Sequence, residues 1–210
     1  MLHVIDLENC NLGSVLRAFD RIGISTTPVR EPAQLADAKA IVLPGVGAFA
    51  ASMGKLDERG FSPVLRDLVQ RDGVPLLGIC LGMQLLGDAS EEHGIHAGLG
   101  LVPGTVKRLR PVSRADKVPH VGWADAVPAK ESYLFPEQTV SSFYFDHSYH
   151  FDCDDSPDIA ARTRFGDEEI TVAIQRGHVA GVQFHPEKSQ DAGLDLLSAH
   201  LHWLRGKGRL

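Results

Sequence analysis

The feature that most constrains the fold of this chain is a regular alternation of strand-like and helix-like patterns over its first 86 residues. Apolar runs of strand length lie at residues 2–6, 24–29, 40–43 and 75–79. Between and after them, apolar side chains recur with the 3.6-residue spacing of an amphipathic helix, at residues 12–22, 49–56, 61–69 and 81–86. Strands that alternate with helices form a parallel sheet with helices on both faces, so we expect this arrangement here.

The pattern changes beyond Gly100, where short strand-like runs follow one another without helices between them. These runs cover residues 104–109, 142–145, 159–164, 171–175 and 179–184, and a last helical pattern covers residues 194–204. The predicted fold class is therefore α/β, with a mostly parallel central sheet, flanking helices and antiparallel additions in the C-terminal half. Because 210 residues suit one domain, residues 1–210 are predicted to form a single domain.

Composition argues against several classes of protein. The 21 basic and 27 acidic residues leave a net charge of −6, whereas nucleic-acid-binding proteins usually carry a basic surplus or stripe. We expect no membrane span, because no run of about 18 apolar residues exists, and the N-terminal residues do not resemble a secretory signal. The three cysteines are widely spaced and form no CxxC pair, which is typical of a reduced compartment, so a cytoplasmic location is expected.

The strongest local signal is Gly78-Ile79-Cys80-Leu81-Gly82, at the junction of a predicted strand and a predicted helix. A nucleophile on so sharp a turn needs small flanking residues, which let the backbone close around it. The helix N-terminus favours the thiolate of Cys80, and the amide of Leu81 can donate to an oxyanion. By itself, the segment is equally compatible with a buried structural cysteine between two glycines that pack against a helix.

A second signal, Gln183-Phe184-His185-Pro186-Glu187, ends an apolar strand. Residues two apart on a strand project to the same side, so Glu187 can orient the imidazole of His185. A nucleophilic cysteine needs such a base, and the base benefits from a third group that holds its ring. Alone, the segment could be a surface turn. Together with Cys80 it predicts a triad of Cys80, His185 and Glu187.

A third signal is the glycine-containing segment Leu43–Phe49, which follows another apolar strand. Glycines let backbone amides approach a ligand closely, so this segment can provide a second oxyanion donor opposite Cys80. An ordinary connection into a helix is the alternative. The segment is not a phosphate-binding loop, because the Lys-Ser/Thr ending is missing.

These three segments together resemble the class I, triad-type glutamine amidotransferases, and the resemblance runs from Ile5 to the C-terminal helix. Its most specific segments are Leu43–Phe49, Gly78–Leu86, Pro119–Trp123, Phe143–Tyr149 and Gly181–Ser189. Within the family, these segments are most similar to the glutaminase subunits of imidazole glycerol phosphate synthases. No His, Cys or acidic grouping has the spacing of a metal site, so neither a metal nor an organic cofactor is predicted.

The resemblance implies a role for each matching residue. Cys80 attacks the carboxamide of glutamine, His185 protonates the departing ammonia, and Glu187 holds the imidazole. The substrate's oxyanion binds to backbone groups of Gly45, Val46, Gly47 and Leu81, in a strand segment that the family is thought to reorient when its partner binds. The amino-acid end of glutamine is held by Gln84, Glu92 and the backbone of Ser142, Phe143 and Tyr144.

The resemblance also implies a partner. Because the glutaminase match occupies nearly the whole chain, the acceptor of the ammonia must lie on another polypeptide. The family points to a (β/α)8-barrel cyclase subunit in a heterodimer, which makes imidazole glycerol phosphate and AICAR in histidine biosynthesis. Segments that meet the barrel contain Asn11, His120, Trp123 and Lys188, although Asn11 could equally be a helix N-cap and Trp123 a core residue.

Three positions near the partner-facing segments depart from the family pattern. Glu8 stands in a turn that usually carries glycine, Ala124 replaces an asparagine, and Asp146 replaces an apolar residue. None belongs to the triad, but they leave open a related glutaminase that serves another synthase, for instance in amidated-sugar synthesis. A stand-alone cysteine peptidase or γ-glutamyl hydrolase, and a non-catalytic binding subunit, are the remaining alternatives.

Overall fold

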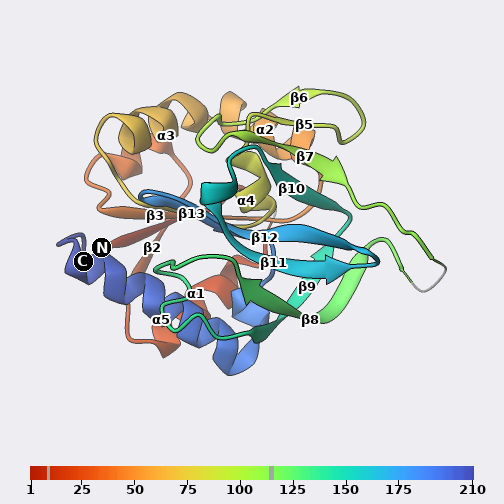
Figure 1. Ribbon diagram of the computed structural model, residues 1–210. Coiled ribbons are helices and arrows are strands. Elements are labelled where there is room, and N and C mark those ends of the chain that lie inside the picture. Colours follow the sequence, from red (N-terminus) through yellow and green to blue (C-terminus); the bar gives the residue numbers. More distant parts are fainter. Residues whose placement is uncertain (9, 114–115) are drawn as a thin grey trace.

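A nine-stranded sheet forms the centre of the molecule in the computed structural model, which describes residues 1–8, 10–113 and 116–210 (Figure 1). Five mutually parallel strands come first in the spatial order of the sheet, and each later strand runs antiparallel to its neighbour. That order is β2 (Thr26–Val29), β1 (Leu2–Ile5), β3 (Ala40–Gly45), β4 (Leu76–Cys80), β13 (Val179–Val182), β12 (Glu168–Arg176), β11 (Ile159–Phe165), β8 (His120–Pro128) and β9 (Ser141–His147). The predicted fold class is confirmed.

A second, four-stranded sheet contains β10 (Tyr149–Cys153), β7 (Gly104–Arg108), β5 (Ala89–Ser90) and β6 (His96–Ala97), in that order. The prediction that the run at residues 104–109 extends the central sheet is therefore wrong. Strand β7 pairs antiparallel with β10 and parallel with β5 instead. Its alternating burial shows that one face is packed, but a period of two does not specify which sheet the strand joins.

Helices cover both faces of the central sheet, as the alternation of patterns predicted (Figure 1). On one face lie α1 (Leu12–Arg21) and α5 (Gln190–Gly206), and on the other lie α2 (Phe49–Glu58) and α3 (Phe61–Gln70). The short helix α4 (Leu81–Leu85) follows β4 directly, and single 3-10 turns occur as η1 (Pro32–Leu35), η2 (Ser156–Asp158) and η3 (Pro186–Lys188). Apolar side chains form one core cluster on each side of the sheet.

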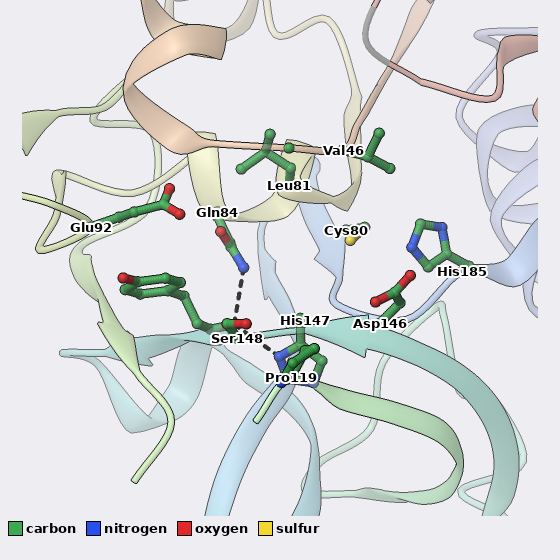
Figure 2. A pocket seen from close by; sticks show the side chains of 12 residues that line it. Val46, Cys80, Leu81, Gln84, Glu92, Pro119, Asp146, His147, Ser148 and His185 are labelled. Atoms are coloured by element: carbon green, nitrogen blue, oxygen red, sulfur yellow. Dashed lines mark hydrogen bonds between the residues drawn. The ribbon is translucent and has the colours of Figure 1, made fainter. Parts of the chain in front are cut away.

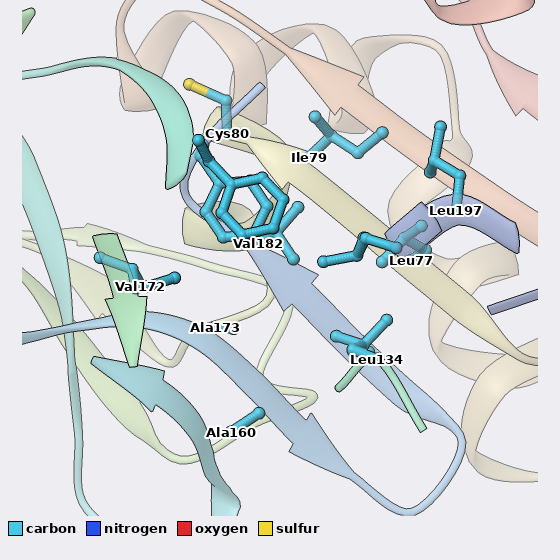
Figure 3. Packing of buried hydrophobic residues seen from close by; sticks show 14 of the residues in the cluster. Leu77, Ile79, Cys80, Leu134, Ala160, Val172, Ala173, Val182 and Leu197 are labelled. Carbon is cyan, nitrogen blue, oxygen red and sulfur yellow. The ribbon is translucent and has the colours of Figure 1, made fainter. Parts of the chain in front are cut away.

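The central strands bring the three sequence signals to one edge of the sheet. Strand β4 lies between β3 and β13, and all three run parallel. Gly45 at the end of β3 is in register with Cys80 at the end of β4, while Val182 ends β13 opposite Ile79. In Figure 3, Leu77, Ile79 and Cys80 of β4 lie beside Val182 in the core cluster. The carboxyl ends of parallel strands are where α/β folds usually bind their ligands.

Candidate active site

Cys80 lies at the sharp turn between β4 and α4, in a backbone conformation that side chains rarely adopt, with φ 55° and ψ −112°. The flanking glycines make this turn possible. A Cβ atom at Gly82 would overlap the carbonyl oxygen of Leu43, and one at Gly78 would lie 2.6 Å from the carbonyl oxygen of Gly82. Neither position can hold a side chain, so both glycines are needed for the close approach of α4 to the strands.

His185 follows β13 and is held by Glu187. Nδ1 of His185 lies 2.8 Å from Oε1 of Glu187, and each of these side chains is only 4% exposed. The backbone amide of His185 donates to the carbonyl of Tyr144 at 2.9 Å, which ties this segment to β9. The carboxylate of Glu187 holds the proton on Nδ1. Nε2 is therefore the ring nitrogen that can exchange a proton with the sulfur of Cys80.

Opposing effects act on the pKa of His185. Burial lowers this pKa, but hydrogen bonding and charge interaction with Cys80 and Glu187 outweigh burial and raise the pKa to about 10. A raised histidine pKa means that the imidazolium is stabilised, here between a cysteine thiolate and a carboxylate. His185 is therefore held in its protonated form, in which it can act as the acid that gives a proton to a leaving amine.

A cavity of about 280 Å³ opens beside Cys80. Figure 2 shows His185 and Asp146 near Cys80, and Gln84 and Glu92 at the opposite end. The remaining lining comes from Val46, Gly47, Leu81, Pro119, His147, Ser148 and Tyr149. The cavity thus has a reactive end, at Cys80 and His185, and a polar end, at Gln84 and Glu92.

The polar end offers hydrogen-bond acceptors. Nε2 of Gln84 donates to the carbonyl of Tyr149 and to Oε1 of Gln183, both at 3.0 Å. Since both amide protons are engaged, Oε1 of Gln84 is the atom left for a ligand. Oε2 of Glu92 accepts from the amide of Phe49 at 2.6 Å, at the N-terminus of α2. Both side chains are therefore held in place, and each keeps an oxygen that can accept from an ammonium group.

Three of the five residues predicted to hold the amino-acid end of glutamine do not line this cavity. Phe143 is buried and stacks on Phe184, with ring centroids 3.9 Å apart. The hydroxyl of Ser142 donates to Asp125, and Tyr144 meets Trp123 edge-on. Instead, the wall is formed by residues 146–149, where β9 ends. The predicted position was too early along the strand, because a sequence motif does not mark where a strand reaches the edge of its sheet.

His147 is a site residue that the sequence did not single out. It is buried, with Nδ1 2.8 Å from the carbonyl of Tyr149 and Nε2 3.2 Å from Nδ1 of His120. Burial lowers the pKa of His147 to about 3, and burial also lowers the pKa of His120. Both rings are therefore neutral at physiological pH. His147 then donates from Nδ1 to Tyr149 and accepts from His120, which fixes the wall of the cavity.

The segment predicted to bind an oxyanion reaches Cys80, and it is packed at Gly45 but exposed at Val46 and Gly47. Gly45 lies opposite Cys80 in the sheet, and a Cβ atom there would lie 3.3 Å from Cβ of Leu81. Val46 and Gly47 line the cavity, yet Val46 is 41% exposed. Gly47 has φ +98°, and a Cβ atom there would have no neighbouring atom within 4 Å. The backbone of this segment can approach a ligand beside Cys80, and few contacts of the chain hold it there.

Three of the four predicted partner-facing residues, Asn11, Trp123 and Lys188, lie near one another in the structure. Trp123 is 49% exposed and contacts the ring of Tyr144, over which Nζ of Lys188 lies at 5.5 Å from the centroid. Asn11 holds the N-cap position of α1 and shares a small cavity with Lys188. His120 points to the other side of β8, where it stacks on Phe145 and contacts His147.

The three departures from the family pattern have different surroundings. Glu8 adopts φ 59°, a conformation usual for glycine, and its carboxylate pairs with Arg59 at 2.7 Å. Ala124 is partly buried against the core. Asp146 lines the cavity near Cys80. Only Asp146 therefore adds a charge to the candidate site.

Two other kinds of feature are absent from the described residues. No helix there combines the length and the apolar character that crossing a bilayer requires. Among the same residues, no group of three or more His, Cys, Asp or Glu side chains is placed to hold a metal ion.

A cysteine at a strained strand-to-helix turn and a carboxylate-held histidine just beyond a neighbouring strand define a cysteine hydrolase or transferase with an α/β fold. The model of the family Glutamine amidotransferase class-I matches residues 3–201. The chain belongs to this family, as its sequence motifs predicted.

Relatives within the family are also similar along nearly the whole chain. The imidazole glycerol phosphate synthase subunit HisH of Chlorobium luteolum is 44% identical over 198 residues, which cover 94% of this chain and 97% of that protein. The subunit HisH of Moorella thermoacetica is 45% identical over 197 residues, covering 92% of this chain and 90% of that protein. The predicted similarity to such subunits is confirmed.

Solved structures share the fold. A crystal structure of a glutamine amidotransferase has a TM-score of 0.73 at 22% identity, covering 94% of this chain and 98% of that chain. The structure of PurLQS from Thermotoga maritima also has a TM-score of 0.73, at 18% identity, covering 97% and 98%. At these identities the similarity is one of fold alone.

Proposed function

We propose that this chain is the glutaminase subunit of an imidazole glycerol phosphate synthase and acts as one domain. It hydrolyses glutamine and delivers the ammonia to a (β/α)8-barrel cyclase subunit, which makes imidazole glycerol phosphate and AICAR in histidine biosynthesis. The observation that carries this proposal is that Cys80 and His185 meet at one cavity, with Glu187 hydrogen-bonded to His185 behind it. The similarity to HisH subunits along 94% of the chain supports the pathway.

The two ends of the cavity set the orientation of glutamine. Its side-chain carboxamide lies beside Cys80 and His185. Its α-ammonium group lies at the polar end, where Oε1 of Gln84 and the carboxylate of Glu92 accept its protons. In this orientation the carboxamide carbon faces the sulfur, and the carboxamide oxygen faces the segment that begins at Gly45.

The first half of the reaction forms a thioester. The thiolate of Cys80 attacks the carboxamide carbon, and the amide of Leu81 and the backbone of residues 45–47 bind the oxygen as it becomes negative. The tetrahedral intermediate then collapses. Its C–N bond breaks while Nε2 of His185 gives its proton to the nitrogen, which leaves as ammonia. Glu187 stabilises the imidazolium before this transfer and keeps Nε2 aimed at the leaving group.

The second half of the reaction releases glutamate. His185, now neutral, takes a proton from water while the water oxygen attacks the thioester carbon. The C–S bond breaks, and the sulfur leaves as the thiolate beside a restored imidazolium. The balance is one glutamine and one water consumed, and one glutamate and one ammonia produced.

The surface next to the cavity has the character of a site that binds another protein, which supports the proposal of a partner subunit. Val121 and Trp123 are large apolar residues of β8 that are 55% and 49% exposed. Val121 is paired with Asp146 of β9, which lines the cavity, so this exposed face adjoins the entrance. Exposed aromatic and aliphatic side chains of this kind are typical of interaction surfaces.

The test uses this chain with a barrel cyclase of an imidazole glycerol phosphate synthase, supplied with its nucleotide substrate. Cyclase product is measured once with glutamine and once with ammonium salt as the nitrogen source. We expect Cys80→Ala to abolish product formation from glutamine and to leave formation from ammonium salt unchanged. Cys153→Ala is the matched control, because that cysteine lies in β10, away from the cavity, and both activities should persist.

Other outcomes identify the alternatives. Glutamine-dependent product formation by Cys80→Ala would mean a non-catalytic subunit. Rapid cleavage of γ-glutamyl peptides without any partner would favour the stand-alone hydrolase. If the wild-type chain hydrolyses glutamine but supports no cyclase activity, the acceptor is another synthase, and co-purification from the native cell identifies it.

A further inference from the structure

Gln183 is a buried polar residue that faces the nucleophile from inside the protein. Its side chain is fully buried, and its backbone amide donates to the carbonyl of Val172 at 2.8 Å. Gln183 and His185 both follow β13, and the side chain of each contacts Cys80. Phe184 between them is buried in the apolar core. Both polar side chains are therefore directed toward the end of β4, where Cys80 lies.

The hydrogen bonds of Gln183 fix which end of its carboxamide meets the sulfur. Oε1 accepts from Nε2 of Gln84 at 3.0 Å, and Nε2 donates to Sγ of Cys80 at 3.8 Å. Gln84 must use its nitrogen here, because the same nitrogen also donates to the carbonyl of Tyr149. The orientation of both amides thus follows from the network, which leaves the amino group of Gln183 toward Cys80.

The sulfur is the one acceptor for that amino group in the part of the chain that the structure describes. A buried amide nitrogen without an acceptor is costly, so the contact with Cys80 is needed to satisfy Gln183. A neutral thiol is a weak acceptor, whereas a hydrogen bond to an ionised group is roughly twice as strong as a neutral one. The contact therefore stabilises the thiolate more than the thiol.

We propose that Gln183 is a further residue of the active site, which donates a hydrogen bond to the Cys80 thiolate from beneath the cavity. In this role it raises the fraction of thiolate and holds the sulfur in the direction of the substrate. The inference rests on the proposed role of Cys80 as the nucleophile. It adds a donor that lies outside the lining of the cavity and is coupled, through Gln84, to the substrate-binding end.

The charges around the sulfur explain why a neutral donor suits this position. His185 and Glu187 follow β13, Asp146 and His147 end β9, and Glu92 lies in the loop after β5. Three of these five groups are carboxylates, which disfavour a nearby thiolate, and His147 is held neutral by burial, which lowers its pKa. A carboxamide offsets this repulsion without adding a positive charge that would compete with His185.

The experiment measures the rate at which iodoacetamide alkylates Cys80 as a function of pH, by mass spectrometry of the peptide that contains it. It uses the whole chain and requires neither glutamine nor a partner. Gln183→Met removes the donor and nearly keeps the volume. We expect the pH midpoint of alkylation to rise by about one unit, and the rate at neutral pH to fall about tenfold. The glutaminase kcat should fall by a similar factor, with little change in KM.

Gln183→Glu is the second variant, because it is nearly isosteric and keeps the acceptor for Gln84. It replaces the donor with an oxygen, so its pH midpoint should rise further than that of Gln183→Met. The matched control is Gln175→Met. Gln175 lies in β12 of the same sheet, and its Oε1 accepts from Oγ of Ser132 at 2.6 Å, away from the cavity. Its variant should lower the melting temperature and leave the alkylation profile unchanged.

Failure of the role of Gln183 and failure of the proposed function would give different results. If the Gln183 variants are alkylated with the wild-type pH profile, Gln183 is only a packing residue and the inference is wrong. If Cys80 of the wild-type chain reacts no faster than Cys10 and Cys153, the proposed function itself fails.

Discussion

The cavity has one packed wall and one open wall. On the packed side, Cys80, His185 and Glu187 have nearly inaccessible side chains that contact one another. On the open side, Val46 is 41% exposed and Gly47 has no close neighbours for a side chain. The chain's own core therefore positions the nucleophile and its acid, whereas contacts within the chain leave the oxyanion segment largely unsupported.

This difference separates two requirements of the reaction. Burial by itself disfavours a thiolate, so stabilising one needs a fixed cationic or hydrogen-bonding partner, which a packed core holds in place. Binding an oxyanion needs backbone amides at one position, and a segment with few contacts is free to take several. That a partner fixes this segment stays a prediction. Changes to the packed wall should affect folding and chemistry together, while changes to the open wall should affect chemistry alone.

The largest effect is expected for Gly82→Ala in the packed wall. The new methyl group would overlap the carbonyl oxygen of Leu43, and neither backbone segment can move without disturbing the sheet. We expect a loss of about 4 kcal/mol or more in the free energy of unfolding, a large part of the stability of a typical domain. Thermal and urea unfolding measure this loss.

Gly54→Ala is the matched control for that variant. Gly54 lies within α2, and a Cβ atom there would have open space. Since alanine favours a helix over glycine, this change should raise stability by up to about 1 kcal/mol. A Gly82→Ala protein as stable as the wild type would contradict the account of the packed wall.

The second effect concerns the charge that holds His185. Glu187→Gln keeps the shape of the side chain but removes the carboxylate, so kcat/KM for glutamine should fall about a thousandfold. The pH profile should change as well. Since the pKa of His185 is raised to about 10, wild-type activity should fall as pH rises through that value and the imidazolium is lost. Removing Glu187 removes one cause of the raised pKa, so this limb of the profile should move to lower pH.

The packed wall was also easier to predict from the sequence than the open wall and the partner face. Cys80 and His185 each lie at or just after the end of an apolar strand, so their position at the sheet edge followed from periodicity, whereas their chemistry followed from the two short motifs taken together. No such signal marks residues 146–149, because a strand pattern does not show where it leaves the sheet. Gln183 contacts Gln84, which is 99 residues away in the sequence, and His147 contacts His120, which is 27 residues away. Local sequence patterns do not reveal such contacts.

A third, smaller effect is expected at the open wall. Gly47 has φ +98°, so alanine there would be strained and would shift the local backbone away from the oxyanion. We expect Gly47→Ala to lower kcat for glutamine about tenfold, with little change in melting temperature. Gly23→Ala is the control, because Gly23 also has positive φ and open space but lies remote from the cavity. An equal fall in kcat for both variants would mean that strain alone, and not its position, is responsible.

The smallest effect is expected for Asp146→Asn, which removes one negative charge from an exposed position of the cavity lining. Glu187→Gln makes the same change in charge on the packed side, so the two variants form a direct pair. Asp146 is exposed, and neither a hydrogen bond to it nor its charge is among the main causes of the raised pKa of His185. Water and salt screen such a charge, so kcat/KM should change by less than about threefold, and less at high salt than at low salt. Steady-state assays at two ionic strengths measure this. A fall close to that of Glu187→Gln would show that burial does not decide the effect of a carboxylate, because exposed Asp146 would then control the acid as strongly as buried Glu187.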